Sequence, residues 1–180
     1  MGIGYGATIS APHMHAFCLE AMLDYLKPGN KVLDVGSGSG YLSSCFYQLV
    51  KPTGKVFGVE HINELVEFSR KNVLKDHPEF LKESNDEGGI KFLVGDGRKG
   101  LKSESPFDAI HVGAAASQFP QDLLDQLNSP GVMIIPVGNS GEDQYLVKYE
   151  KDKSAKVTKK NLMGVMYVPL TSKQEQLFER

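Results

Sequence analysis

The chain has 180 residues, 41% of them hydrophobic, and a formal net charge of −2 at pH 7. This length predicts a single α/β domain over residues 1–180 with a sizeable core, and the scattered basic residues give no argument for a nucleic-acid partner. Because the sequence has no apolar run long enough to span a membrane, no signal peptide and only two cysteines, we expect a cytosolic protein with free thiols.

Apolar runs and helical stripes alternate along most of the chain. The runs predict five strands, at residues 31–35, 55–60, 90–94, 107–112 and 132–136. The stripes predict four helices, at residues 13–26, 41–50, 63–75 and 121–127. Residues 76–89 are polar and contain Pro78 and two adjacent glycines, so we expect a loop there. Strands that alternate with helices form a parallel sheet with helices on both faces.

The last part of the chain breaks this alternation. Two strand-like runs, 144–150 and 161–168, are joined by the lysine-rich stretch 151–160 without an intervening helix. They predict an antiparallel hairpin over residues 144–168 with a solvated, polar tip. The expected fold is therefore a Rossmann-like mixed sheet of seven strands. In this organisation residues 1–30 form a loop and a first helix, and residues 31–136 form the cofactor-binding core.

The first buried strand runs into three glycines at alternate positions, Gly36, Gly38 and Gly40, the first of them two residues after Asp34. Such a turn lets the backbone approach a ligand closely. The spacing G-x-G-x-G differs from the dinucleotide fingerprint and resembles motif I of the S-adenosylmethionine-dependent methyltransferases. No lysine follows as in a phosphate loop, and Gly38 stands where the nucleophile elbow of a serine hydrolase requires a serine.

Two acids at the ends of later strands extend this pattern. Glu60 ends the second strand, where a carboxylate accepts hydrogen bonds from both ribose hydroxyls and repels the 2′-phosphate of NADP. Asp96 follows the third strand, and we expect it to accept a hydrogen bond from the adenine amino group. The three features in this order predict a binding site for S-adenosyl-L-methionine.

Residues 7–15, Ala-Thr-Ile-Ser-Ala-Pro-His-Met-His, resemble the signature of the protein-L-isoaspartate O-methyltransferases, which methylate isoaspartyl residues in damaged proteins. Four further stretches match the same family, at residues 33–42, 95–98, 108–116 and 162–171. The chain is thus similar to animal-type members over most of its length. The resemblance implies methyl transfer from S-adenosyl-L-methionine to the carboxyl group of L-isoaspartyl and D-aspartyl residues, which initiates their repair and yields S-adenosyl-L-homocysteine. It also implies a monomer with no metal ion and no nucleic-acid or membrane partner.

The resemblance further implies roles for individual residues. Ser10 is the implied catalytic residue, and Ser10, His15 and Val168 are the implied substrate contacts. The implied cofactor contacts are Ala7, Thr8, Ile9, Ser10, His15, Asp34, Gly36, Ser37, Gly38, Ser39, Gly40, Glu60, His61, Asp96, Gly97, Thr171 and Gln176. An isoaspartyl carboxylate is ionised at pH 7 and needs no general base, so the expected task of Ser10 is to position it.

Some of these residues have structural alternatives. Ser10 precedes Pro12 and would equally cap a helix that starts there. His13, His15 and Cys18 are zinc-ligand types, but no further ligand pair with suitable spacing follows them. His61 and His111 lie at strand ends, where packed or capping histidines are common.

Family members carry a further helical segment before the stretch that starts here at Met1. The alternative function is therefore a catalytically weak S-adenosylmethionine-binding module or adaptor. Methylation of an isoaspartyl peptide, compared with its aspartyl twin, separates the two hypotheses.

Overall fold

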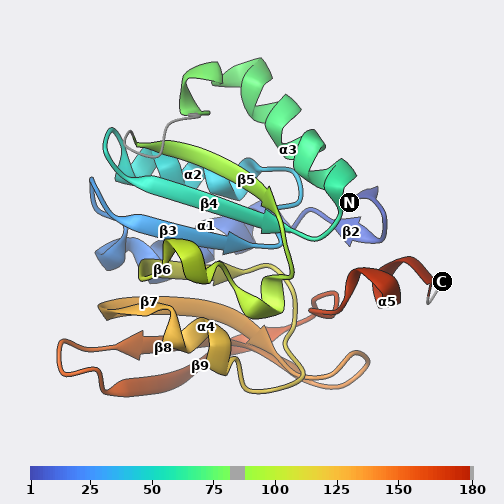
Figure 1. The fold of residues 1–180 in the computed structure, drawn as a ribbon. Coiled ribbons are helices and arrows are strands. Elements are labelled where there is room, and N and C mark those ends of the chain that lie inside the picture. The colour runs from blue at the N-terminus through green and yellow to red at the C-terminus, as the bar shows by residue number, and fades with distance from the viewer. Residues whose placement is uncertain (82–87, 179–180) are drawn as a thin grey trace.

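A seven-stranded sheet with the strand order β5-β4-β3-β6-β7-β8-β9 forms the centre of the molecule (Figure 1). The structure is a computed structural model and describes residues 1–81 and 88–178. The strands are β3 (Lys31–Val35), β4 (Lys55–Glu60), β5 (Gly89–Val94), β6 (Phe107–Val112), β7 (Leu127–Val137), β8 (Gln144–Lys151) and β9 (Val157–Val165). Strands β3 to β7 pair in parallel, whereas β8 is antiparallel to both β7 and β9. The predicted mixed sheet is confirmed.

Helices cover both faces of this sheet, as predicted. The α-helices of the described residues are α1 (Pro12–Met22), α2 (Tyr41–Val50), α3 (Asn63–Asp76), α4 (Gln121–Asp125) and α5 (Lys173–Phe178), of which the first four pack on the sheet. Helices α1 to α3 pack with one side of the strands in one hydrophobic cluster, and α4 packs with the other side in a second. Val32 and Leu33 of β3 point into opposite clusters, and both are fully buried. A strand buried on both faces reads as the continuous apolar run seen in the sequence.

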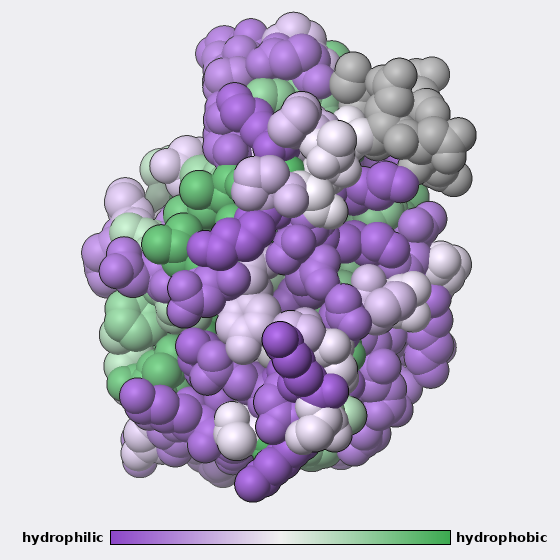
Figure 2. All heavy atoms as spheres, turned by 90° about the vertical axis from the view of Figure 1, so that its left-hand side faces the viewer, coloured by the Kyte–Doolittle hydropathy of each residue, from purple (hydrophilic) through white to green (hydrophobic). Residues whose placement is uncertain are grey.

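The segments that the fold brings to the carboxyl ends of the parallel strands come from both ends of the chain. A small antiparallel hairpin, β1 (Gly2–Gly4) and β2 (Ala7–Thr8), lies there near α5 (Figure 1). The opposite side of the molecule is mostly hydrophilic (Figure 2). No helix in the described part of the chain is both long enough and apolar enough to cross a bilayer.

The C-terminal hairpin differs from its prediction. Strand β9 runs over Val157–Val165 instead of 161–168, and it pairs with β8 from Lys151 opposite Val157, so the connection is only residues 152–156. The Asp152 carboxylate closes this turn by accepting hydrogen bonds from the backbone N–H groups of Ser154 and Lys156. Of the five lysines assigned to a solvated tip, only Lys153 and Lys156 lie in this turn, whereas Lys151 belongs to β8 and Lys159 and Lys160 to the exposed edge strand β9. Because both faces of that part of β9 are exposed, its sequence has no apolar alternation.

Several other helix and strand boundaries differ from their predicted positions. The first helix ends at Met22 and tightens into a 3-10 turn, η1 (Leu23–Tyr25), before Pro28-Gly29. Helix α4 ends at Asp125, and β7 begins at Leu127, five residues before the predicted start. The predicted loop over 76–89 contains the short helix η2 (Pro78–Phe80), and its middle, residues 82–87, lies outside the described residues.

Candidate functional site

The glycine turn after β3 adopts backbone conformations that require glycine. Gly36, Gly38 and Gly40 have φ values of 80°, 50° and 78°. The backbone N–H of Gly36 donates to the carbonyl of Val59 over 2.8 Å, which ties the turn to the neighbouring strand β4. A Cβ atom on Gly40 would approach the backbone oxygen of Ser69 to 3.2 Å. The turn thus holds bare backbone at the carboxyl end of β3, where ligands bind in parallel sheets.

A narrow cavity opens beside this turn. Nine of the predicted cofactor contacts line it: Ala7, Thr8, Gly36, Gly38, Glu60, His61, Gly97, Thr171 and Gln176. The other eight do not. Ile9 and Ser10 line a second cavity, whereas His15, Asp34, Ser37, Ser39, Gly40 and Asp96 line neither of the two.

Glu60 lines the first cavity, and in the described part of the chain only one of its carboxylate oxygens is hydrogen-bonded. It is 8% exposed, and its Oε1 atom accepts hydrogen bonds from the backbone N–H groups of His61 (2.9 Å) and Ile62 (3.3 Å). Within the described residues Oε2 has no hydrogen-bond partner. A carboxylate with one fixed and one open oxygen is suited to accept hydrogen bonds from the hydroxyl groups of a ribose.

Gln176 closes the first cavity from the C-terminal side. Its side-chain nitrogen donates to the carbonyl of Tyr5 over 2.8 Å, and its oxygen lies 2.7 Å from Nε2 of His61. Helix α5 begins with a capping box, in which the N–H of Glu175 donates to the Ser172 hydroxyl and the N–H of Ser172 donates to the Glu175 carboxylate. One side chain therefore links α5, the N-terminal hairpin and the end of β4.

Glu175 is held by donors at the start of α5. The hydroxyls of Thr171 and Ser172 both donate to its carboxylate. The Thr171 hydrogen bond is the main cause that lowers the pKa of Glu175 to about 2. Thr171, a predicted cofactor contact, lines the first cavity but directs its hydroxyl proton to Glu175.

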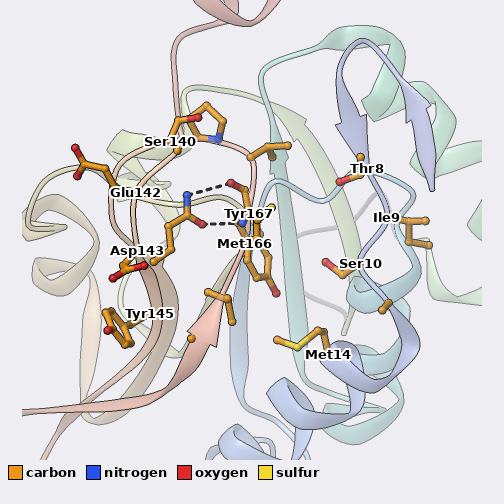
Figure 3. A pocket seen from close by; sticks show the side chains of 18 of the residues that line it. Thr8, Ile9, Ser10, Met14, Ser140, Glu142, Asp143, Tyr145, Met166 and Tyr167 are labelled. Atoms are coloured by element: carbon orange, nitrogen blue, oxygen red, sulfur yellow. Dashed lines mark hydrogen bonds between the residues drawn. The ribbon is translucent and has the colours of Figure 1, made fainter.

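A second, larger cavity of about 1220 Å³ adjoins the first (Figure 3). Its walls include the chain before α1, the loop between β7 and β8, and the chain after β9. Thr8, Gly113, Val168 and Pro169 line both cavities, so the two spaces meet at these residues. Figure 3 shows Ser10 and Tyr167 facing the same part of this space, with Glu142 and Asp143 on the opposite wall.

Ser10 does not cap helix α1. The N-cap residue is Ala11, no side chain caps the helix, and Pro12 occupies its first position. The capping alternative is therefore wrong, and the half-buried Ser10 side chain lines the second cavity instead.

A buried polar cluster lies below the glycine turn. Asp34 is 2% exposed and accepts hydrogen bonds from the Ser43 hydroxyl (2.5 Å) and from Nδ1 of His111 (2.9 Å). Burial alone would lower the pKa of His111, but its hydrogen bonds with Asp34 and Cys18 outweigh burial and raise this pKa to about 10. The His111 ring is therefore a cation at pH 7. Asp34 supports the turn from below with both oxygens engaged.

His15 lies near this cluster, and its pKa is shifted in the opposite direction to that of His111. Burial lowers the pKa of His15, and the charge of His111 lowers it further, so the His15 ring is neutral at pH 7. Neither ring nitrogen has a hydrogen-bond partner among the described residues. No three His, Cys, Asp or Glu side chains in the described part of the chain approach one another closely enough to hold a metal ion.

Asp96 is engaged by a neighbouring arginine. Its carboxylate accepts hydrogen bonds from Nε (3.0 Å) and Nη2 (2.8 Å) of Arg98 and from the Arg98 backbone N–H. The Arg98 side chain is the main cause that lowers the pKa of Asp96. Its predicted contact with adenine would use lone pairs that Arg98 leaves open.

Sequence reasoning did not predict several residues of these cavities as cofactor or substrate contacts, and it assigned Tyr167 to the core with a backbone that could pair with an extended peptide. Gly113 lies where the cavities meet, Tyr167 faces Ser10, and the buried Gln144 holds Tyr167. Helix α5 was not predicted either, although the spacing of Ser172 and Glu175 is a helix-start signal. Contacts between Gln144 and Tyr167 leave no such signal, because 22 residues of chain separate the two positions.

Comparisons with known proteins agree with this geometry. Residues 1–175 match the family model described as Protein-L-isoaspartate(D-aspartate) O-methyltransferase. The protein-L-isoaspartate O-methyltransferase of Triticum aestivum is 51% identical over 177 residues, which cover 98% of this chain and 75% of the wheat protein. Protein-L-isoaspartate O-methyltransferase 2 of Arabidopsis thaliana is 52% identical over 176 residues, which cover 97% of this chain and 55% of that protein.

A comparison with solved structures points to the same family. The crystal structure of a Plasmodium falciparum protein, described as a protein-L-isoaspartate O-methyltransferase in complex with S-adenosyl-L-homocysteine, superposes with a TM-score of 0.85 at 38% identity. The match covers 95% of this chain and 79% of that chain. The chain therefore belongs to the protein-L-isoaspartate O-methyltransferase family.

Proposed function

We propose that the chain transfers a methyl group from S-adenosyl-L-methionine to the carboxylate of L-isoaspartyl and D-aspartyl residues in damaged proteins and peptides. The observation that carries this proposal is the wall of Thr8, Gly113, Val168 and Pro169, which is common to both cavities. A donor in the first cavity and a carboxylate in the second would meet there. The family relationship supports this activity over an adaptor role.

The residues of the first cavity fit the proposed cofactor. Gly36, Gly38 and Gly97 line this cavity and present backbone without side chains. Glu60 offers its open oxygen to the ribose, and Gln176 covers the cavity. When bound, S-adenosyl-L-methionine supplies an electrophilic methyl group next to a sulfonium charge.

The protein has to position the acceptor and does not have to remove a proton from it. A carboxylate with a pKa near that of an α-carboxyl group is ionised at pH 7, so no general base is required. Ser10 donates a hydrogen bond that orients the carboxylate toward the common wall. Met14, Val165 and Val168 line the second cavity and limit the access of water to the attacking oxygen.

The domain organisation, oligomeric state, location and partners belong to the same proposal. We expect one methyltransferase domain that acts as a monomer in the cytosol on isoaspartyl-containing proteins, without a nucleic-acid or membrane partner. The net charge of −2 supports the absence of a nucleic-acid partner, because such partners attract strongly basic surfaces. Ser10, His15 and Val168 remain the proposed substrate contacts.

The test is methyl transfer to an isoaspartyl peptide and to its aspartyl twin. We expect turnover of the isoaspartyl peptide alone. Ser10→Ala should lower kcat/KM about tenfold or more, since one hydrogen bond to a charged group is lost, while the affinity for S-adenosyl-L-homocysteine stays unchanged. Ser103→Ala, at an exposed serine outside both cavities, is the matched control. Cofactor binding without any methylation would favour the adaptor role instead.

A further inference from the structure

Gln144 uses its side chain as a strand partner for Tyr167. The regular pairing of β8 with β9 ends at Gln144 opposite Val165. Beyond that pair, the Gln144 side-chain oxygen accepts a hydrogen bond from the N–H of Tyr167 over 2.7 Å, and its nitrogen donates to the Tyr167 carbonyl over 3.2 Å (Figure 3). Gln144 is only 4% exposed, so water does not compete for these bonds. The backbone of Tyr167 is thereby fixed at the wall of the second cavity.

The phenol of Tyr167 reaches the part of the cavity where Ser10 lies. Figure 3 shows its side chain extending toward the Ser10 side of the space. Burial raises the pKa of the Tyr167 hydroxyl, although an interaction with the Ser10 hydroxyl acts in the opposite direction. The phenol therefore keeps its proton at pH 7 and remains a hydrogen-bond donor.

A carboxylate acceptor has two oxygens, and the transfer uses only one of them. Two hydroxyl donors from different segments, Ser10 before α1 and Tyr167 after β9, suit the two oxygens of one carboxylate. A donor on the attacking oxygen orients that atom at some cost to its charge. A donor on the other oxygen would fix the orientation of the group without that loss.

We propose that Tyr167 binds the non-attacking oxygen of the acceptor carboxylate, and that Gln144 is the positioning residue that aims Tyr167 at it. This inference rests on the proposed methylation of isoaspartyl residues and adds a second carboxylate donor to that site. The hydrogen bond is strongest to the fully charged carboxylate before transfer. Its loss should therefore raise KM for the peptide more than it lowers kcat.

The first test compares Tyr167→Phe with Tyr25→Phe. Both substitutions remove one phenolic hydroxyl from a half-buried ring, but Tyr25 lies in η1 and lines neither cavity. We expect KM for the isoaspartyl peptide to rise about tenfold or more in Tyr167→Phe, with kcat within about threefold of the parent, and no change in Tyr25→Phe. Unchanged kinetics in Tyr167→Phe would overturn the proposal and leave the ring as packing alone.

The second test asks whether Tyr167 recognises the α-carboxylate of the peptide. Peptide affinity is measured by calorimetry with S-adenosyl-L-homocysteine present, for an isoaspartyl peptide and for the same peptide with the α-carboxylate replaced by an amide. Tyr167→Phe should weaken binding of the first peptide and leave the second unchanged. Equal losses for both peptides would contradict carboxylate recognition. If the parent protein neither binds nor methylates the isoaspartyl peptide, the proposed function itself fails, which is a distinguishable result.

The role of Gln144 is tested by a double-mutant cycle. Gln144→Leu should raise KM in the parent, because Tyr167 loses its fixed backbone, but should have little further effect in Tyr167→Phe. Gln144→Glu, which keeps an acceptor for the Tyr167 N–H, should fall between the parent and Gln144→Leu. Circular dichroism shows whether each variant is folded. Additive effects of Gln144→Leu and Tyr167→Phe would show that Gln144 does not act through Tyr167.

Discussion

Glu60 shows how one residue can serve both the fold and the proposed cofactor. The backbone N–H groups of His61 and Ile62 hold its Oε1 atom, whereas Oε2 has no hydrogen-bond partner among the described residues and the residue lines the first cavity. Removal of the negative charge should leave the turn intact and weaken the hydrogen bonds to the ribose. Loss of this charge should therefore lower the affinity for the cofactor and leave the methyl-transfer step itself unaffected.

We therefore predict that Glu60→Gln weakens S-adenosyl-L-methionine binding by about 1–3 kcal/mol, measured by calorimetry. The matched control is Glu67→Gln, which makes the same change at a carboxylate on α3 that is 66% exposed. Equal affinities of the parent and Glu60→Gln would remove the ribose assignment.

The ion pair of Asp34 and His111 predicts a pH dependence of stability. An unfolded histidine has a pKa of about 6.5. In the folded chain the Asp34 and Cys18 contacts raise the pKa of His111 to about 10 against the effect of burial. Because the folded pKa is the higher one, the stabilisation is complete below pH 6.5 and is lost as the pH rises toward 10.

Urea unfolding between pH 6.5 and 9.5 should thus show a falling free energy of unfolding, and the His111 ring signals in NMR spectra should stay in the protonated form at pH 8. A ring that loses its proton below pH 7 would contradict the assignment.

At the level of elements, α5 is held to the first cavity by its capping box and by Gln176. Ser172→Ala removes one cap, at a local cost of about 1 kcal/mol, and should weaken S-adenosyl-L-homocysteine binding several-fold because Gln176 is held less firmly. Ser154→Ala, at the exposed turn between β8 and β9, is the matched control.

The capping effect should depend on Gln176. In a Gln176→Ala background, Ser172→Ala should have no further effect on binding measured by calorimetry. A full additional loss in that background would mean that the cap acts on the cavity by another route.

The sequence predicted correctly those strands that are buried on both faces of the sheet. Strands β3, β4 and β6 match their predicted residues, because each is buried on both faces and reads as an apolar run. The glycine turn and Glu60 were likewise found, since their chemistry lies in consecutive residues. Strand β9 and helix α5 were misplaced or missed because the first is an exposed edge and the second is a single short turn held by tertiary contacts.

The two cavities of the candidate site also differ in how far the sequence predicts them. The first cavity is built mainly from strand ends, which the sequence pattern marks. The second depends on Gln144 holding Tyr167 across a hairpin whose length was not predicted correctly. The roles given to individual residues, and the division of residues 1–180 into one domain with three parts, stay predictions.

For the whole molecule, the open edge at β9 bears on the proposed monomeric state. Residues 157–161 are exposed along this edge, and they include Lys159 and Lys160. An edge strand offers unpaired N–H and C=O groups to other chains, and lysines oppose such pairing by charge repulsion and desolvation. Register places Lys160 opposite Lys148, which pairs with Glu150 over 3.0 Å, so Lys159 and Lys160 of β9 supply the repulsive charge along this edge.

We predict that the parent chain stays monomeric at micromolar concentration, whereas the double substitution Lys159→Ile with Lys160→Val self-associates through β9. Light scattering coupled to size-exclusion chromatography measures the mass of both. Lys71→Ile with Lys75→Val removes two charges and adds the same apolar groups on exposed positions of α3, where no strand edge is available, so this variant should remain monomeric. A dimeric parent would overturn the proposed state, and association of the α3 variant to the same extent would show that lost charge, rather than the open edge, drives the assembly.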